Sequence, residues 1–429
     1  MSEVLQIEAE DDRFARFRLM SWWDQPRLAA ARVLVIGAGA LGNEILKNLA
    51  LLGIGQAVVC DLDQIEQSNL SRSVLFREGD RGRAKSVIAA ERAREIYPGF
   101  HVVPWVGNVV YDLGLGLYRW ADVIIAGLDN REARVAINRS AARAGKVWID
   151  GAIERLDGVA RVFDPACGPC YECTMSANDW KMLAARRSCA LLSRSDLAQG
   201  KTPTTPTTAS IIAGIQCQEG VKLLHGLETL VGKGFVFEGL SHQSYVVSYT
   251  RKDDCPSHDP LEGVESLDWR VHETTARQLL ERARNDLGPG AILEFHTDLL
   301  NGFDCPQCHS QADHFASLGR VTEGEGMCPQ CGTLRVPRTY HTLAGTEPFL
   351  DEPLGRLGVP AWDVISARVG TTHRHYELSG DARDVLGTLA PHCANNANQT
   401  APRNPAPIHS LPPNPASENP VPVPMAKDP

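Results

Sequence analysis

Polar and charged residues gather after an early apolar strand in this sequence. The run RVLVIG over 32–37 leads into a glycine-rich turn that holds Gly37, Gly39 and Gly42. Glycines between a strand and a helix let the backbone approach a phosphate at the helix N-terminus. Asp61 ends the next apolar run, where a carboxylate can bond a ribose hydroxyl. This pattern by itself predicts a nucleotide site and leaves the nucleotide open.

The residues around and after Asp61 indicate which nucleotide is bound. The stretch DLDQIEQSNLSR brings Asp63, Asn69 and Arg72, and Lys85 follows shortly afterwards. An amide donor and two cations just past a strand end suit a triphosphate on which negative charge develops. A nicotinamide cofactor would need an apolar ring pocket at that place, which leaves a dehydrogenase as a distant alternative. We therefore expect ATP at these residues.

A second polar pair follows another apolar run. Asp129 and Asn130 come directly after ADVIIAG and Leu128. Ligands of open α/β sheets bind at the carboxyl ends of the strands, so both residues are predicted to lie at the nucleotide site. A carboxylate there suits a magnesium ion.

Cysteine spacing predicts metal sites. Two C-P-x-C motifs, separated by nineteen residues, form a zinc-ribbon pattern, and their thiols are Cys305, Cys308, Cys328 and Cys331. Two further pairs are each spaced for one metal, namely Cys170 with Cys173 and Cys255 with His258. Thiols used as metal ligands are consistent with a reducing compartment. We expect structural zinc, because four protein ligands leave no open position for catalysis.

The order of apolar runs predicts the fold class. Strand and helix patterns alternate up to about residue 153, which implies a Rossmann-like, mostly parallel sheet covered by helices. Residues 1–261 are predicted to form the ATP-binding domain, with an irregular crossover at 175–207. Residues 262–394 form a smaller zinc-ribbon domain with a helix over about 273–288. The proline- and asparagine-rich stretch 395–429 is predicted to be a disordered tail.

Composition excludes several classes of function. The chain has 429 residues, 43% of them hydrophobic, and a formal net charge of -9. An acidic balance disfavours a general nucleic-acid binder. The N-terminal stretch lacks the pattern of a secretory signal, and the sequence holds no apolar run of about eighteen residues. We expect a cytoplasmic protein that has no membrane partner.

Several segments in order resemble motifs of one superfamily. They are GAGALGNEILKNLALLGIG, DLDQIEQSNLSRSVLF, RGRAK, AGLDNREAR, IDGAI, PCYEC and IQCQEGVKLLHG. Over residues 10–258 the sequence resembles the ubiquitin-activating and ThiF/MoeB adenylyltransferase superfamily, most closely a bacterial enzyme that activates a ubiquitin-like protein. The resemblance implies that a C-terminal glycine carboxylate attacks the α-phosphate of ATP, which releases pyrophosphate and leaves an acyl-adenylate.

The same resemblance assigns roles to residues. It gives the ribose to Asp61, the magnesium ion to Asp129, and the phosphates to Asn69, Arg72 and Lys85. Arg16, in RFARFRL, matches an arginine that reaches the partner's active site in homodimeric members, so a homodimer is expected.

The resemblance also places the first two metal pairs in one zinc site. His258 departs from the usual second C-x-x-C pair, and Cys167 is an alternative ligand. Cys217 lies among apolar residues of a helix and is interpreted as a core residue.

Cys189, in AARRSCALLS, is the predicted nucleophile. It follows the first cysteine pair in the crossover, where family members carry a reactive cysteine, and Arg186 and Arg187 can lower the pKa of its thiol. A thioester there would be passed to a ubiquitin-conjugating-like enzyme. Activation of a sulfur-carrier protein for thiocarboxylate formation is the second interpretation, and a non-catalytic zinc-bearing scaffold is the third. The stretches HYELSGD and GVPAWDVISARVG suggest a small sheet that recruits the conjugating enzyme or the carrier.

Overall fold

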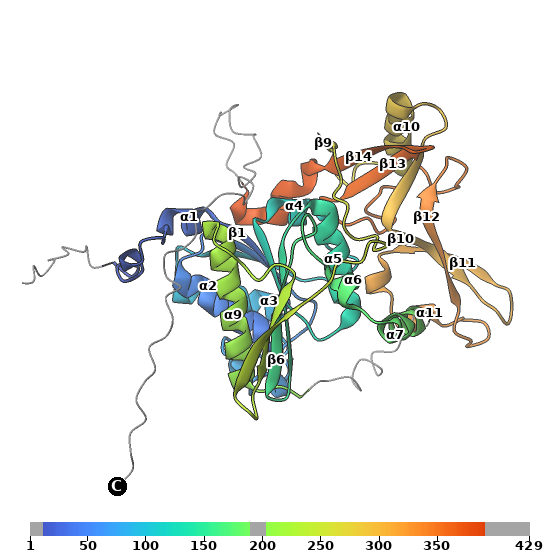
Figure 1. The fold of residues 1–429 in the computed structure, drawn as a ribbon. Helices are drawn as coiled ribbons and strands as arrows, with labels where there is room; N and C mark the ends of the chain where they lie inside the picture. The colour runs from blue at the N-terminus through green and yellow to red at the C-terminus, as the bar shows by residue number, and fades with distance from the viewer. Residues whose placement is uncertain (1–11, 189–202, 391–429) are drawn as a thin grey trace, which may run out of the picture. The chain divides into compact units, whose positions relative to one another are not determined.

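The larger of two β-sheets carries the first half of the chain in a computed structural model that describes residues 12–188 and 203–390 (Figure 1). Its eight strands lie in the order β3-β2-β1-β4-β5-β6-β7-β8. Their bounds are β1 (Arg32–Ile36), β2 (Gln56–Cys60), β3 (His101–Trp105), β4 (Val123–Gly127), β5 (Trp148–Glu154), β6 (Asp157–Phe163), β7 (Lys233–Glu238) and β8 (Gln243–Ser248). The first five are parallel and the last three antiparallel.

Helices cover both faces of the parallel strands, whose side chains are almost all buried. Apolar side chains of α1, α2, α3 and α9 pack on one face, and those of α4, α5, α6 and α7 on the other (Figure 1). The helix bounds are α1 (Gln25–Ala30), α2 (Ala40–Leu52), α3 (Lys85–Ile96), α4 (Leu115–Trp120), α5 (Arg131–Ala144), α6 (Tyr171–Thr174), α7 (Ala177–Ser188) and α9 (Pro206–His225). This three-layer arrangement confirms the predicted Rossmann-like class.

Strand order reverses beside β1. The chain runs outward from β1 through β2 to β3 and then returns to β4 on the other side of β1. In open α/β sheets such a reversal leaves a crevice at the carboxyl ends of the two central strands, where ligands bind. Ile36 pairs with Cys60 on one side and with Ala126 on the other. The loops that follow these three strands therefore meet at one edge of the sheet.

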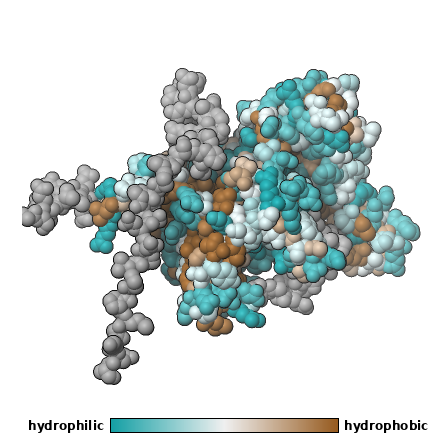
Figure 2. Space-filling model, in the orientation of Figure 1, coloured by the Kyte–Doolittle hydropathy of each residue, from teal (hydrophilic) through white to brown (hydrophobic). Residues whose placement is uncertain are grey.

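The antiparallel end of the larger sheet is partly exposed. Strand β8 has one neighbour, β7, and most of its side chains face solvent. Tyr245 and Val246 are 47% and 51% exposed, and Leu240 in the preceding turn is 84% exposed. Figure 2 shows a hydrophobic area over α9 on the face in view. One residue of α9, Ile211, is 38% exposed.

The smaller sheet has the order β11-β10-β13-β14-β9, and β12 also pairs with β10. Its elements are β9 (Val264–Leu267), α10 (Ala276–Leu287), β10 (Ile292–Asp304), β11 (Gln311–Ala316), α11 (Glu323–Gly326), β12 (Val336–Leu343), β13 (Val364–Val369), β14 (Thr372–Leu378) and α12 (Ala382–Leu386). Leu279 and Leu280 of helix α10 pack against the apolar face of this sheet. β13 and β14 lie in the stretches GVPAWDVISARVG and HYELSGD, for which a small sheet was predicted, and they pair antiparallel within this sheet. Their recruiting role stays a prediction.

Residues on both sides of the predicted boundary at 261 share one hydrophobic cluster. Trp362, Val364 and Leu386 pack in the same cluster as residues of β1 and α4. The Trp362 ring lies directly against Gly116, where an added Cβ would approach it to 2.4 Å. The Trp362 backbone has a φ of 58°, and its indole N–H donates to Glu377 at 2.7 Å. These contacts join the smaller sheet to α4.

One expected element differs from the structure. Residues 177–188 form helix α7, although the crossover was predicted to be irregular; Trp180 and Leu183 anchor this helix in the hydrophobic core. Helix α4 begins at Leu115 and follows a turn over residues 107–112, in which the Asp112 carboxylate accepts the Asn108 N–H. No helix in the described part of the chain is long and apolar enough to span a bilayer.

Candidate nucleotide site and metal clusters

The glycine loop after β1 is held tightly against its neighbours on one side and is open on the other. Gly37 has a φ of 93°, and a Cβ there would lie 2.5 Å from the Gly127 carbonyl oxygen. A Cβ on Gly42 would lie 1.9 Å from the Gly37 carbonyl oxygen. Gly39, at the N-cap of α2, faces open space, because an added Cβ would meet no atom within 4 Å. The helix N-terminus is therefore open at Gly39, which suits a phosphate.

Asp61 joins this loop to the end of β2. Its carboxylate accepts the Ala38 N–H at 2.7 Å and the Asp63 N–H at 2.8 Å. Burial raises the pKa of Asp61, and the positive charge of Lys85 opposes this rise. The predicted ribose ligand is thus fixed beside the glycine loop.

The loop after Asp61 folds back so that its end lies beside its start, which places Lys85 next to Asp63. Gln64 forms a bridge with Ala84, and the Lys85 N–H donates to the Asp63 carbonyl at 2.9 Å. The Lys85 ammonium group consequently lies 2.8 Å from the Asp63 carboxylate, with 12% of its side chain exposed. An ammonium group at the same edge as the glycine loop can bind the phosphates of a nucleotide.

Asn69 and Arg72 lie on the intervening loop. The Asn69 side-chain oxygen accepts the Glu66 N–H at 2.9 Å, so a ligand contact would come from its NH₂ group. Arg72 donates to the Ser68 carbonyl at 2.7 Å, which holds the guanidinium group near its own turn. Leu75 and Phe76, both buried, anchor the end of this loop in the hydrophobic core.

Asp129 and Asn130 follow β4, next to β1. Asp129 is exposed, as a magnesium ligand at a sheet edge would need to be. The Asn130 side chain accepts the Ala133 N–H at 2.7 Å and caps α5. This helix-capping role accounts for the asparagine at this position.

Arg16 does not join these residues within one chain. Arg13 donates to the Ile96 carbonyl at 3.0 Å, and the Phe14 ring lies against Gly53 at the C-terminal end of α2. The glycine loop is at the other end of α2, which has 13 residues. A helix of that length spans about 20 Å, further than an arginine side chain reaches.

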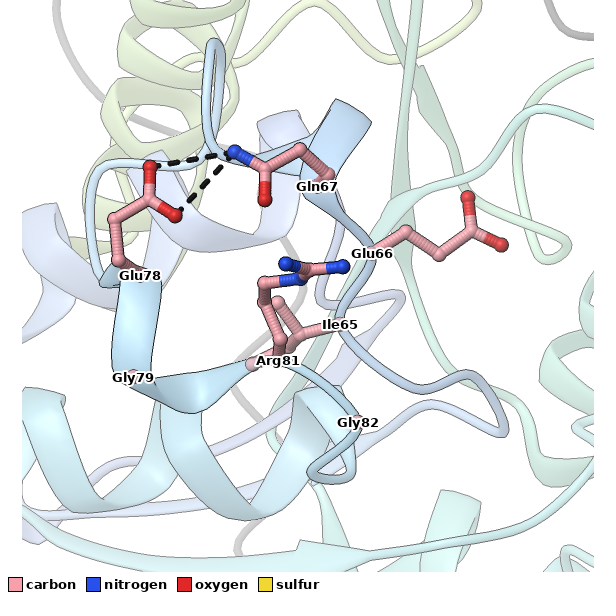
Figure 3. A pocket seen from close by; sticks show the side chains of 7 residues that line it. All are labelled: Ile65, Glu66, Gln67, Glu78, Gly79, Arg81 and Gly82. Atoms are coloured by element: carbon pink, nitrogen blue, oxygen red, sulfur yellow. Dashed lines mark hydrogen bonds between the residues drawn. The ribbon is translucent and has the colours of Figure 1, made fainter.

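A hollow of about 690 Å³ opens in the same loop region (Figure 3). It is lined by Ile65, Glu66, Gln67, Glu78, Gly79, Arg81 and Gly82. Gln67 donates to both oxygens of Glu78 at 3.3 Å across it. None of the predicted nucleotide residues lines this hollow, and we place the site at the strand ends because the open helix N-terminus and the lysine lie there.

A buried ion-pair triad supports β5 behind this edge. Asp150 is fully buried and accepts from Arg134 at 2.8 Å and from Arg161 at 2.9 Å. Arg134 also donates to the carbonyl of Gly151 at 3.1 Å. Burial by itself would raise the pKa of Asp150, but the two guanidinium charges outweigh it and hold this pKa below its ordinary value.

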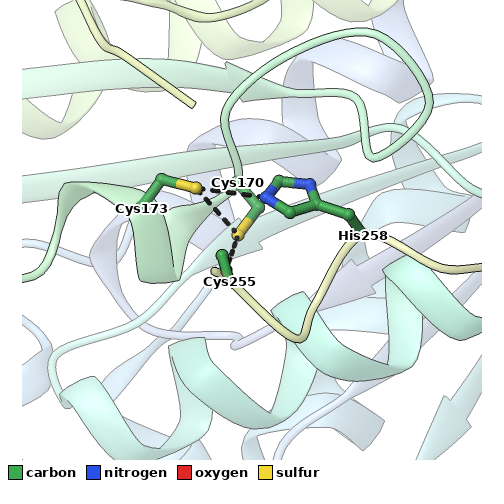
Figure 4. Close-up of side chains that lie close together, drawn as sticks. All are labelled: Cys170, Cys173, Cys255 and His258. Atoms are coloured by element: carbon green, nitrogen blue, oxygen red, sulfur yellow. Dashed lines mark hydrogen bonds between the residues drawn. The ribbon is translucent and has the colours of Figure 1, made fainter. Parts of the chain in front are cut away.

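The first metal cluster combines residues that are far apart in the sequence (Figure 4). Cys170 Sγ lies 3.8 Å from Cys173 Sγ and 3.5 Å from Cys255 Sγ, and Cys173 Sγ lies 3.2 Å from His258 Nε2. A tetrahedral zinc ion with ligands near 2.3 Å needs donor atoms about 3.8 Å apart, so the set fits zinc. Cys167 instead contacts the Asp164 carboxylate at 3.3 Å and is outside the cluster.

The second cluster is built from two matching turns. Cys305 Sγ lies 3.4 Å from Cys331 Sγ, and Cys308 Sγ lies 3.6 Å from Cys328 Sγ. In each turn the residue after the second cysteine has a positive φ, 58° at His309 and 70° at Gly332. Four thiols in this geometry fit a structural zinc ion.

Replacing His258 by alanine is expected to remove one of two bound metal ions. The wild-type chain should carry about two zinc ions, one per cluster, and the variant about one, because three thiols bind zinc more weakly than a complete set of four ligands. Mass spectrometry of metals in purified protein measures the ratio. Cys167→Ala is the control and should keep both ions; equal metal content in the two variants would contradict the assignment.

Some predictions lie beyond the described residues, and one feature of the site was missed. Cys189 and the stretch 395–429 fall outside the described residues. Cys217 of α9 is buried in the hydrophobic core, as predicted from its apolar neighbours in the sequence.

Asn43 was not predicted, although its side chain contacts two loops of the site. The available signal was a carboxamide in the first turn of the helix that follows the glycine loop.

Comparison with known proteins adds to this geometry. The sequence model of the ThiF family matches residues 12–257. Over 157 residues the chain is 40% identical to the NEDD8-activating enzyme E1 catalytic subunit of Arabidopsis thaliana, with 34% of each chain covered. It is 30% identical over 284 residues to the SAMP-activating enzyme E1 of Haloferax volcanii, covering 62% of this chain and 96% of that protein.

A third relative has a different named activity. The chain is 29% identical over 238 residues to the sulfur carrier protein adenylyltransferase of Thermus thermophilus, covering 54% of this chain and 83% of that protein. The chain therefore spans 34% of the length of the Arabidopsis relative and most of the length of the other two.

Proposed function

Because this chain belongs to the ThiF family, we propose that it adenylates the C-terminal glycine of a ubiquitin-like protein and then captures the acyl group on Cys189. The main support is the assembly at one sheet edge of an open helix N-terminus, Asp61 and the Lys85 ammonium group. These groups suit the ribose and phosphates of ATP.

In the proposed first step, a carboxylate oxygen of the glycine attacks the α-phosphorus of ATP. The bond from that phosphorus to the bridging oxygen breaks, and pyrophosphate leaves with its electron pair. Both reactants are anions, so Lys85 and Arg72 lower the barrier by offsetting their repulsion. Asp129 would hold a magnesium ion, which supplies further positive charge to the phosphates.

In the proposed second step, the Cys189 thiolate attacks the acyl carbon of the adenylate. A thioester forms and AMP leaves, taking the electrons of the acyl–oxygen bond. A conjugating enzyme would then accept the acyl group on its own thiol. The Arabidopsis and Haloferax relatives are both named as E1 activating enzymes, which supports thioester formation and transfer. The exposed apolar residues Leu240, Tyr245 and Val246 offer a surface for a protein partner.

Activation of a sulfur-carrier protein is the second candidate function, and the name of the Thermus relative favours it. The adenylate would form in the same way, but the terminal sulfur of a persulfide would attack its acyl carbon and displace AMP, which leaves an acyl disulfide. A second thiol would then break the S–S bond, which releases the thiocarboxylate and leaves a disulfide on the sulfur donor. The two candidates differ only after the adenylate.

One experiment separates the candidates. ATP–pyrophosphate exchange is measured with a glycine-ended ubiquitin-like protein on wild type, Cys189→Ala and the control Cys167→Ala, followed by a non-reducing gel. Exchange by all three with a thiol-sensitive adduct missing only from Cys189→Ala supports conjugation. Exchange without any adduct supports sulfur transfer, and no exchange by any protein rejects adenylation.

We also propose that the chain acts as a homodimer in which Arg16 completes the site of the other subunit. The position of Arg16 at the far end of α2 supports action across subunits, since its own glycine loop is out of reach.

Mixing two inactive variants tests the shared site. Arg16→Ala and Lys85→Met dimers are each expected to be nearly inactive. After subunit exchange, the mixture should regain about a quarter of the wild-type rate, because half of the dimers then hold one intact site. No recovery, with subunit exchange verified by mass, would mean that Arg16 does not act across subunits.

A further inference from the structure

Asn43 links the two loops that form the candidate nucleotide site. Its side-chain NH₂ group donates to the Ala38 carbonyl at 2.7 Å and to the Gly39 carbonyl at 3.0 Å. Its side-chain oxygen accepts the Leu75 N–H at 2.9 Å. One carboxamide therefore contacts the glycine loop and also the end of the loop that carries Arg72.

Asn43 makes these hydrogen bonds in a buried environment, so losing one of them would affect the fold. The residue is fully buried in the first turn of α2. Its partners are the carbonyls of Ala38 and Gly39 and the N–H of Leu75, which lie at buried positions or beside them. A backbone group left without its hydrogen bond there lowers the stability of the fold. Leu75 is 4% exposed and packs in the hydrophobic core, so the contact ties the second loop to a fixed point.

Few side chains can replace this carboxamide. It supplies two N–H donors and one acceptor at the length needed to reach both loops. An aspartate of the same shape keeps the acceptor for Leu75 but turns a carboxylate oxygen toward the carbonyls of Ala38 and Gly39. A serine is too short to span the distance and keeps a single hydroxyl.

We propose that Asn43 is a positioning residue for nucleotide chemistry: it fixes the glycine loop, which approaches the phosphates, relative to the loop that presents Arg72. This inference rests on the proposed function, because it assumes that both loops act on one nucleotide. A shift of the arginine by about 1 Å can reduce the rate of a chemical step about a hundredfold while substrate binding changes less.

The test compares Asn43→Asp and Asn43→Ser with wild type in ATP–pyrophosphate exchange. Asn43→Asp should lower kcat about 10- to 100-fold and change the KM for ATP about threefold or less, because the geometry of the phosphates is altered more than their binding. Asn43→Ser should change kcat in the same direction by a smaller factor. Circular dichroism at the assay temperature gives the folded fraction used to correct each rate.

Ile45→Val is the matched control. It removes a methyl group from a fully buried residue of the same helix and breaks no side-chain hydrogen bond. This variant should lose some thermal stability and keep wild-type kcat. An unchanged kcat in Asn43→Asp, or an equal loss in Ile45→Val, would overturn the inference by reducing Asn43 to a stabilising role.

Failure of the proposed function would be visible separately. If wild type binds ATP by calorimetry but shows no exchange, adenylation is rejected and the Kd for ATP becomes the readout. ATP binding about threefold weaker in Asn43→Asp, the upper end of the change expected for the KM, with wild-type affinity in Ile45→Val, would then support the positioning role. Equal affinities in all three proteins would reject it.

Discussion

Replacing Lys85 by methionine is expected to slow ATP–pyrophosphate exchange about 100- to 1000-fold, the usual effect of removing one group that stabilises transition-state charge. Lys85 is 12% exposed and lies 2.8 Å from Asp63 at the edge where the glycine loop and Asp61 meet. Methionine has a similar length and retains the packing of the aliphatic stem, so the charge is the main property removed. Initial rates at saturating carrier, corrected for folded protein, measure the effect.

Lys222→Met is the control for this charge removal. Lys222 is also partly exposed and also pairs with a carboxylate, that of Glu219 at 2.7 Å in α9. Its removal should leave the exchange rate near that of wild type. Equal rate losses in the two variants would mean that Lys85 contributes to the fold and not to the chemistry.

Replacing Asp150 by alanine is expected to lower the free energy of unfolding by about 3–5 kcal/mol, since it leaves buried guanidinium groups without their counter-charge. Arg134 and Arg161 are 9% and 14% exposed, while the Asp150 side chain is fully buried. Urea unfolding followed by circular dichroism gives the difference. Asp351→Ala, which removes an exposed partner of Arg277, should have almost no effect because surface ion pairs contribute little.

The Asp150 effect should also depend on pH. The pKa of Asp150 is depressed in the folded state below its ordinary value of 3.8. A depressed carboxyl pKa contributes stability that is present above the unfolded value and is lost as the pH falls through the folded value. The stability gap between wild type and Asp150→Ala should therefore narrow as the pH falls from about 3.8, where the unfolded chain takes up the proton, to the lower pH at which the folded protein is protonated as well. A gap that stays constant down to acid unfolding would contradict the ion-pair explanation.

The alternation of strands and helices could be predicted because the apolar runs are long and regular. β1, β2 and β4 are buried on both faces, and their sequences consist mostly of valine, isoleucine, leucine and alanine. The glycine loop, the zinc-ribbon cysteines and the two other ligand pairs were also predictable, since turns and metal-ligand pairs depend on residues at short, fixed spacings. The joining of Cys170 and Cys173 with Cys255 and His258 was expected only from the family resemblance.

Other features depend on contacts between distant segments. Asn43 meets Leu75 only because the loop after β2 folds back over α2. In the sequence, Asp150 is one residue of a strand pattern. Its ion pairs form because Arg134 of α5 and Arg161 of β6 lie against it in the folded protein. The parallel pairing of β9 with β14 joins residues about a hundred positions apart, and no local pattern specifies such a partner.

Asn130 and Arg16 show why the contacts of a predicted residue could not be predicted from the sequence. Asn130 was expected near the nucleotide, and its side chain caps α5. Arg16 was expected to reach the partner's active site, and within its own chain the neighbouring Phe14 lies at the end of α2 that is opposite to the glycine loop. Residue type and position along a motif predict a location, whereas a role follows from the partners that folding supplies.

Isotope transfer tests the central claim, adenylation of a C-terminal carboxylate, most directly. A glycine-ended ubiquitin-like protein labelled with oxygen-18 in that carboxylate is incubated with ATP, magnesium and the enzyme, and the adenylate is then cleaved by an added thiol. The account predicts release of pyrophosphate and AMP that carries one atom of the label, because the carboxylate oxygen becomes bonded to the α-phosphorus. Release of ADP, or AMP without label, would contradict it.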